Sequence, residues 1–150
     1  MRPRMVIGQA QLAEIGRLAA SSYPDEGCGV LVGTAGEGVI RIDAVLPGRN
    51  LRTDRARDRY ELDPADILAA ERRARAEGRD VVGFWHSHPD HPARPSAFDT
   101  ERAWTDYLYV IASTAATGTE DIRGWQLPAE GGQFIELTLD TVSAVSAEPR

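Results

Sequence analysis

All three histidines of the chain fall within six positions, at His86, His88 and His91. His86 and His88 stand at i and i+2, and on a β-strand that spacing points both imidazoles to the same face. Zinc readily takes neutral imidazoles and a carboxylate as ligands, and catalytic zinc sites keep one of four positions for water. If the loop PDHPARP (89–95) turns Asp99 back toward them, these residues predict a hydrolytic zinc site.

Each part of this pattern also has an ordinary structural explanation. Ser96-x-x-Asp99 is a capping box for a helix that begins after the serine. The H-x-H pair could be two strand-end histidines with satisfied hydrogen bonds, and His91 among prolines is typical of a solvated loop. The combination favours a metal site, because H-x-H-x7-S-x2-D directly follows VVGFW (81–85), the strongest strand signal in the chain.

A hydrolytic metal site needs a base, and Glu26 is the candidate. It precedes CGVLVG (28–33), a buried strand by its length and β-branching, although after Pro24 and Asp25 it could equally be part of a turn. Cys28 lies on the same strand face as Glu26, so a cysteine hydrolase that uses Cys28 with a histidine is a rival hypothesis. A thiol inside an apolar strand stays protonated, which disfavours that rival.

The rest of the chain supplies elements that could position these groups. Helices are predicted over residues 9–22, 64–77 and 96 to about 105, the second with Asp63 as N-cap and Pro64 as its first residue. Strands are predicted at 5–8, 28–33, 39–47, 60–64, 81–85, 107–113, 121–127 and 133–139. The strands at 28–33 and 39–47 should form a hairpin. This order predicts an α+β (α/β-like) fold with helices packed on a sheet.

Composition narrows the classes of function. The 150-residue chain has a net charge of −6, which argues against nucleic acid or an anionic membrane as the main partner. One cysteine allows no internal disulfide, and no apolar run approaches the ~20 residues that span a bilayer. We expect a cytoplasmic, single-domain protein over residues 1–150, with its core at about 5–140. The oligomeric state stays open.

EGCGVLVG (26–33) together with HSHPDHPARPSAFD (86–99) resembles the JAMM, or MPN+ (Mov34/MPN), family of zinc metalloproteases. The shared pattern is a Glu before a Cys-Gly-apolar strand, then H-x-H, seven residues, Ser, two residues and Asp. Asn50 and YELDP (60–64) are also similar to short prokaryotic, single-domain members. The resemblance implies a mixed, mostly antiparallel curved sheet flanked by two main helices. A short helix after the zinc loop completes this architecture, which is like that of cytidine deaminases.

Carried over residue by residue, the resemblance implies that His86, His88 and Asp99 bind one Zn²⁺ per chain. Glu26 would deprotonate the zinc-bound water and then protonate the leaving amine, and Ser96 would help to stabilise the tetrahedral oxyanion. The implied reaction is hydrolysis of a peptide or isopeptide bond after the C-terminal Gly-Gly of a ubiquitin-like or sulfur-carrier protein.

Further alternatives stay open beside this enzyme. One is a catalytically silent MPN module that acts as a scaffold, although such modules usually lack a ligand. Another is a zinc hydrolase for a small amide. The segment 49–59 carries five Arg against two Asp. We hypothesise that Arg52, Arg55 and Arg57 attract an acidic carrier, with a merely solvated loop as the alternative.

Overall fold

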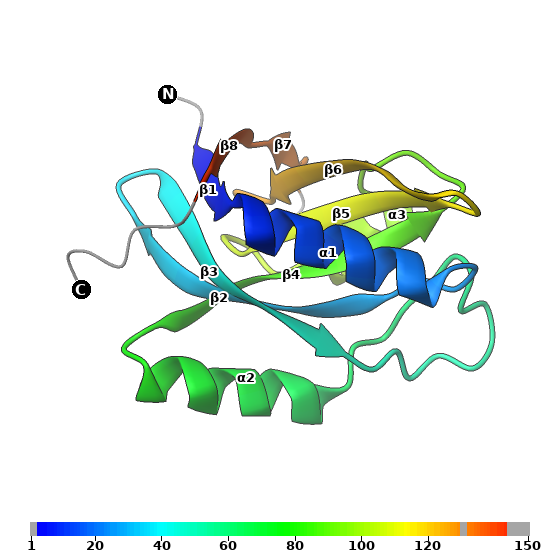
Figure 1. Ribbon diagram of the computed structural model, residues 1–150, viewed down its shortest axis with the longest axis horizontal. Coiled ribbons are helices and arrows are strands. Elements are labelled where there is room, and N and C mark those ends of the chain that lie inside the picture. Colours follow the sequence, from blue (N-terminus) through cyan, green and yellow to red (C-terminus); the bar gives the residue numbers. More distant parts are fainter. Residues whose placement is uncertain (1–2, 130–131, 144–150) are drawn as a thin grey trace.

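The computed structural model describes residues 3–129 and 132–143. Within these residues a sheet of eight strands, in the order β7-β6-β5-β4-β2-β3-β1-β8, is accompanied by three helices (Figure 1). The strands are β1 (Arg4–Gly8), β2 (Cys28–Gly36), β3 (Val39–Gly48), β4 (Asp80–Pro89), β5 (Leu108–Ala115), β6 (Gly118–Gln126), β7 (Ile135–Glu136) and β8 (Thr138–Val142); the helices are α1 (Gln9–Ser22), α2 (Pro64–Ala76) and α3 (Ala97–Arg102). None of the helices in this part of the chain is long and apolar enough to cross a membrane.

The sheet is mixed, as the resemblance implies. Strand β1 runs parallel to β3 and β8, and β4 runs parallel to β5. The other pairings, which include the β2–β3 hairpin and the central β2–β4 pair, are antiparallel. The predicted hairpin is therefore confirmed, and the sheet is mostly antiparallel.

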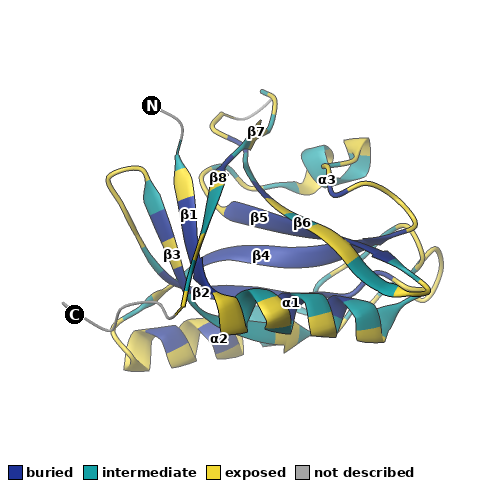
Figure 2. Ribbon diagram, turned by 45° about the horizontal axis from the view of Figure 1, so that its top comes forward, coloured by how far each residue is buried: buried dark blue, intermediate teal, exposed yellow. Residues whose placement is uncertain are grey.

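Helices α1 and α2 cover opposite faces of the sheet (Figure 1). Helix α1 buries Ile15 in an apolar cluster that contains Trp85, and α2 buries Ala70 and Ala74 in a second cluster that contains Phe84. Figure 2 shows the buried strands β4 and β5 at the centre of the molecule. Because both faces are covered, these central strands are mainly apolar, and polar side chains there need a specific reason.

Strand β4 continues past its apolar part and carries the histidine pair. Phe84 packs on the α2 side and Trp85 on the α1 side. The two-residue period of a strand therefore places His86 and His88 on the same face as Phe84. Both imidazoles are buried. The strand is longer than the predicted 81–85, because the histidines still pair with β5, at Ile111 and Ser113.

The structure corrects three sequence predictions of local structure. The run 133–139 is not one strand: β7 pairs with β6, while β8 pairs with β1 at the opposite edge, because Leu137 between them is buried in the core. The predicted strand at 60–64 is reduced to a single bridge between Asn50 and Leu62. Helix α3 ends at Arg102, since the Trp104 N–H donates to Tyr109 Oη (2.8 Å) instead of continuing the helix.

Gly83 allows β4 and β5 to approach closely, which gives a test of this packing. A Cβ at Gly83 would collide with the carbonyl oxygen of Leu108, whereas a Cβ at Gly36 meets nothing within 4 Å. We expect Gly83→Ala to lower the free energy of unfolding by about 1–3 kcal/mol. Gly36→Ala should change it by less than about 0.5 kcal/mol. Urea unfolding measures both, and equal effects would contradict the constraint.

Candidate metal centre

Strands β2 and β4 bring Glu26 and the histidine pair together. In their antiparallel register Cys28 pairs with His86, so Glu26, two residues before Cys28, lies opposite His88. One potential ligand atom from each of Glu26, His86 and His88 lies within 4.8 Å of the others, and all three residues are buried. This cluster could hold a metal ion.

Helix α3 adds a second carboxylate. Asp99 Oδ2 lies 3.2 Å from His86 Nε2 and 3.0 Å from His88 Nε2, and the two nitrogens are 3.2 Å apart. Ligands at the usual distances from a tetrahedral zinc ion are separated by about 3.3 Å. The triangle formed by these three atoms therefore has the size of one face of a tetrahedral zinc site.

The protonation states of these groups also suit a cation. His88 Nδ1 donates to the carbonyl oxygen of Pro92 (2.8 Å), which leaves the Nε2 lone pair facing Asp99. Burial lowers the pKa of His86 and keeps its ring neutral. Burial alone would raise the pKa of Asp99, but its contacts with the two histidines and with the Ser96 amide bring it below its usual range. A neutral His86, the Nε2 lone pair of His88 and an ionised Asp99 are a donor set that suits a bound cation.

Ser96 is the N-cap of α3. Its Oγ accepts a hydrogen bond from the Asp99 N–H (3.0 Å), and Asp99 Oδ2 accepts one from the Ser96 N–H (2.9 Å). The predicted capping box is therefore confirmed. The same carboxylate oxygen reaches both histidines, so the helix cap also holds Asp99 in its orientation toward them.

Glu26 is a buried acid with a perturbed pKa. It is 5% exposed, and among the described residues its Oε1 has no hydrogen-bond partner. Burial, together with the negative charges of Asp99 and Asp58, raises the pKa of its carboxyl to about 9. A nearby cation would favour the carboxylate and lower this pKa. Perturbed acids of this kind are candidates for proton transfer.

The segment between β3 and α2 packs over Glu26, and Asn50 organises it. The Asn50 Nδ2 donates to the carbonyl oxygens of Glu26 and Arg59, both at 3.2 Å. The Asn50 Oδ1 accepts from the N–H groups of Arg52 and Glu61, at 3.0 and 2.9 Å. One side chain therefore uses all its hydrogen-bonding positions to order this segment.

Tyr60 stacks on His86, with ring centroids 4.5 Å apart and planes inclined by 24°. His86 Nδ1 is buried and has no hydrogen-bond partner among the described residues. The plane of the His88 ring is fixed by its hydrogen bond to Pro92, whereas the plane of the His86 ring is fixed by the stack on Tyr60. Burial raises the pKa of Tyr60 well above its usual value. Sequence reasoning missed Tyr60, because it assigned 60–64 to a strand and a lone aromatic residue gives no specific signal.

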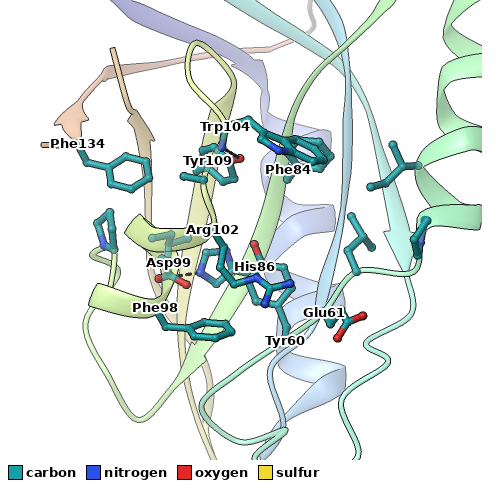
Figure 3. Close-up of a pocket in the computed structure, with 16 residues that line it drawn as sticks. Tyr60, Glu61, Phe84, His86, Phe98, Asp99, Arg102, Trp104, Tyr109 and Phe134 are labelled. Carbon is teal, nitrogen blue, oxygen red and sulfur yellow. Dashed lines mark hydrogen bonds and ion pairs between the residues drawn. The ribbon is translucent and has the colours of Figure 1, made fainter. Parts of the chain in front are cut away.

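Two clefts open beside the centre. The aromatic cleft, of about 390 Å³, reaches His86 and Asp99 (Figure 3). Its aromatic residues are Tyr60, Phe84, Phe98, Trp104, Tyr109 and Phe134. The basic cleft, of about 540 Å³, reaches Glu26 and His88. Its arginines are Arg55, Arg59 and Arg94. Phe98 lines both clefts. Groups of a substrate can therefore lie on either side of the centre.

The remaining residues that the sequence singled out lie around this centre. His91 is exposed in its loop, as predicted, and lines the basic cleft. Cys28 is buried, and burial together with the charge of Glu26 raises the pKa of its thiol to about 12. A thiol with so high a pKa is a poor nucleophile at neutral pH.

The arginines of the basic segment are partly paired within it. Arg52 lies 3.4 Å from Asp54, and Arg55 lies 2.6 Å from Asp58. Arg57 is exposed. Attraction of an acidic carrier by Arg52, Arg55 and Arg57 stays a prediction.

Comparison with known proteins agrees with this geometry. Residues 8–128 match the family described as prokaryotic homologs of the JAB domain. The chain is 41% identical to the desampylase of Haloferax volcanii over 122 residues, and this aligned region covers 81% of each protein. It is 32% identical to the CysO-cysteine peptidase of Mycobacterium tuberculosis over 110 residues, and this aligned region covers 73% of each protein.

A solved structure shows the same fold. The structure of a protein from Desulfitobacterium hafniense superposes on this chain with a TM-score of 0.83 and 25% sequence identity. The superposition covers 96% of this chain and 97% of the other. The resemblance to the JAB/MPN proteins seen in the sequence is confirmed. The chain belongs to the family of prokaryotic JAB-domain homologs and is a JAB-type hydrolase.

Proposed function

We propose that the chain is a zinc-dependent peptidase or isopeptidase that cleaves after the C-terminal Gly-Gly of a ubiquitin-like or sulfur-carrier protein. The observation that carries the proposal is the triangle of His86 Nε2, His88 Nε2 and Asp99 Oδ2, with the buried Glu26 beside it. The names of the two relatives, a desampylase and a CysO-cysteine peptidase, support this class of substrate.

Each residue of the centre has a role in this reaction. His86, His88 and Asp99 would hold the zinc ion, which as a Lewis acid polarises the scissile carbonyl and makes water acidic enough to attack at neutral pH. Within the described part of the chain nothing hydrogen-bonds to Glu26 Oε1, so this oxygen can accept the proton of the attacking water and deliver it to the leaving amine. The Ser96 hydroxyl proton is not used by the helix cap and can be donated to the developing oxyanion.

The first prediction concerns the activity itself. The zinc-loaded protein should cleave a ubiquitin-like carrier that is extended by a residue after Gly-Gly. Glu26→Gln should lower kcat by about 10²–10⁴-fold while zinc is retained at about one ion per chain, because the substitution removes only the proton carrier. Mass spectrometry of the products and metal analysis measure these effects.

Glu101→Gln, at an exposed position on α3, is the control and should keep full activity. Zinc binding without cleavage of any carrier would identify a silent scaffold module instead. Cleavage of small amides but no carrier would identify the small-amide hydrolase, and cleavage that survives EDTA would contradict the metal mechanism.

The second prediction concerns the stability of the metal-free protein. Because the pKa of Glu26 rises from 4.5 to about 9 on folding, the folded state keeps a proton that the unfolded chain releases between these values. Glu26 therefore lowers stability as the pH rises above 4.5, by at most about 1.4 kcal/mol per pH unit. Glu26→Gln should exceed the wild type in stability, by a margin that grows between about pH 5 and 8.

Urea unfolding in EDTA at several pH values measures this margin. Glu101→Gln should show no such pH-dependent difference from the wild type, because its carboxyl is exposed. A margin for Glu26→Gln that stays constant with pH would show that the carboxyl is already ionised in the metal-free protein.

The third prediction tests the rival cysteine hydrolase. Cys28→Ala should keep kcat/KM within about threefold of the wild type, because the buried thiol takes no part in the reaction. Iodoacetamide at about pH 8 should leave Cys28 of the native protein unmodified, as measured by mass spectrometry. Loss of activity in Cys28→Ala, with zinc content and Tm unchanged, would support the cysteine hydrolase.

A further inference from the structure

The position of Glu26 determines which half of the substrate lies in which cleft. Glu26 lines the basic cleft and does not line the aromatic cleft. The acid that protonates a leaving amine must lie within hydrogen-bond reach of its nitrogen. The amine half of the substrate therefore lies in the basic cleft, and the acyl half, with the Gly-Gly tail of the carrier, lies toward His86, Asp99 and the aromatic cleft.

The basic cleft holds more positive charge than its acids neutralise. Arg55 is paired with Asp58 at 2.6 Å. Over residues 3–129 and 132–143, neither Arg59 nor Arg94 forms an ion pair. These two arginines come from separate segments, before α2 and after β4, yet they line the same cleft. On a chain with a net charge of −6, this local excess indicates an anionic ligand.

The position of Arg59 is defined by Phe98. The Arg59 guanidinium lies over the Phe98 ring, 4.5 Å from its centroid, which is the geometry of a cation–π contact. This contact uses the face of the guanidinium and leaves its N–H groups at the edge free to bind an oxyanion in a forked manner. Arg94 is exposed and adds a second cation to the same cleft.

We propose that Arg59 and Arg94 form a carboxylate subsite, and that the leaving group is a C-terminal amino acid or short peptide with a free carboxylate. In such a substrate the carboxylate follows closely on the scissile nitrogen, so it lies in the basic cleft when the nitrogen is near Glu26. A lysine side chain in an isopeptide bond brings no carboxylate to this place. This inference rests on the proposed peptidase function and specifies the substrate for it.

Matched substrates test the subsite. One is a ubiquitin-like carrier that ends in Gly-Gly-Ala with a free carboxylate, and the second is the same carrier with a C-terminal carboxamide. The third carries Gly-Gly on a lysine side chain of a folded protein. With the zinc-loaded enzyme, we expect kcat/KM for the free acid to exceed that for the carboxamide by about 10- to 100-fold, mainly through KM.

Three arginine variants separate the subsite from general attraction. Arg59→Gln and Arg94→Gln should each reduce the acid-to-carboxamide ratio of kcat/KM about tenfold, since each removes one charged donor. Arg94→Gln leaves the contact between Arg59 and Phe98 in place, so its effect does not depend on that ring. Arg57→Gln is the matched control: Arg57 is exposed in the same segment but lines neither cleft, and the ratio should be unchanged.

The outcomes distinguish the two proposals. If zinc is bound but none of the three substrates is cleaved, the proposed function fails. If the acid and the carboxamide are cleaved equally well, or the isopeptide is cleaved faster than the acid, the proposed function stands and the carboxylate subsite fails. A preference for the acid that survives the double substitution of Arg59 and Arg94 would also overturn the subsite.

Discussion

The proposed metal centre depends on the close approach of three polar atoms in a buried place. Two imidazole nitrogens and one carboxylate oxygen lie 3.0–3.2 Å apart, a spacing that a cation bound among them would stabilise. The fold holds each group by a different contact. The Pro92 carbonyl orients His88, the helix cap orients Asp99, and the ring of Tyr60 orients His86.

These contacts belong to two parts of the molecule, the central strands and the segments beside them. The histidines and Glu26 are attached to β4 and to the start of β2, in the centre of a sheet that is covered on both faces. Asp99 and Tyr60 come from the segments beside it, whose geometry depends on local hydrogen bonds such as those of Asn50. A sheet holds side chains more accurately than a loop, so under the proposed function the central strands would define the position of the ion and the loops would complete its site.

Local patterns in the sequence predicted the features that depend on local structure. The H-x-H spacing indicated a shared strand face, and Ser96 with Asp99 indicated a capping box, because each follows from geometry within a few residues. The approach of Glu26 to His88 depends on the β2–β4 register, which no local pattern contains, and the family resemblance supplied it. The aromatic cleft was not predictable, since its walls come from several separate segments. The division of 133–139 between two sheet edges was missed for the same reason, because it depends on where Leu137 finds its core contacts.

Helix α3 connects the metal centre with both clefts. Within one short helix and its cap, Asp99 faces the histidines, while Phe98 borders the two clefts and contacts the guanidinium groups of Arg59 and Arg102. Phe98 and Asp99 are neighbours in the chain, so the short helix that brings the carboxylate to the histidines also supplies a wall that both clefts share. Under the proposed function, one element would therefore contribute both to the metal centre and to the surfaces that contact the two halves of a substrate.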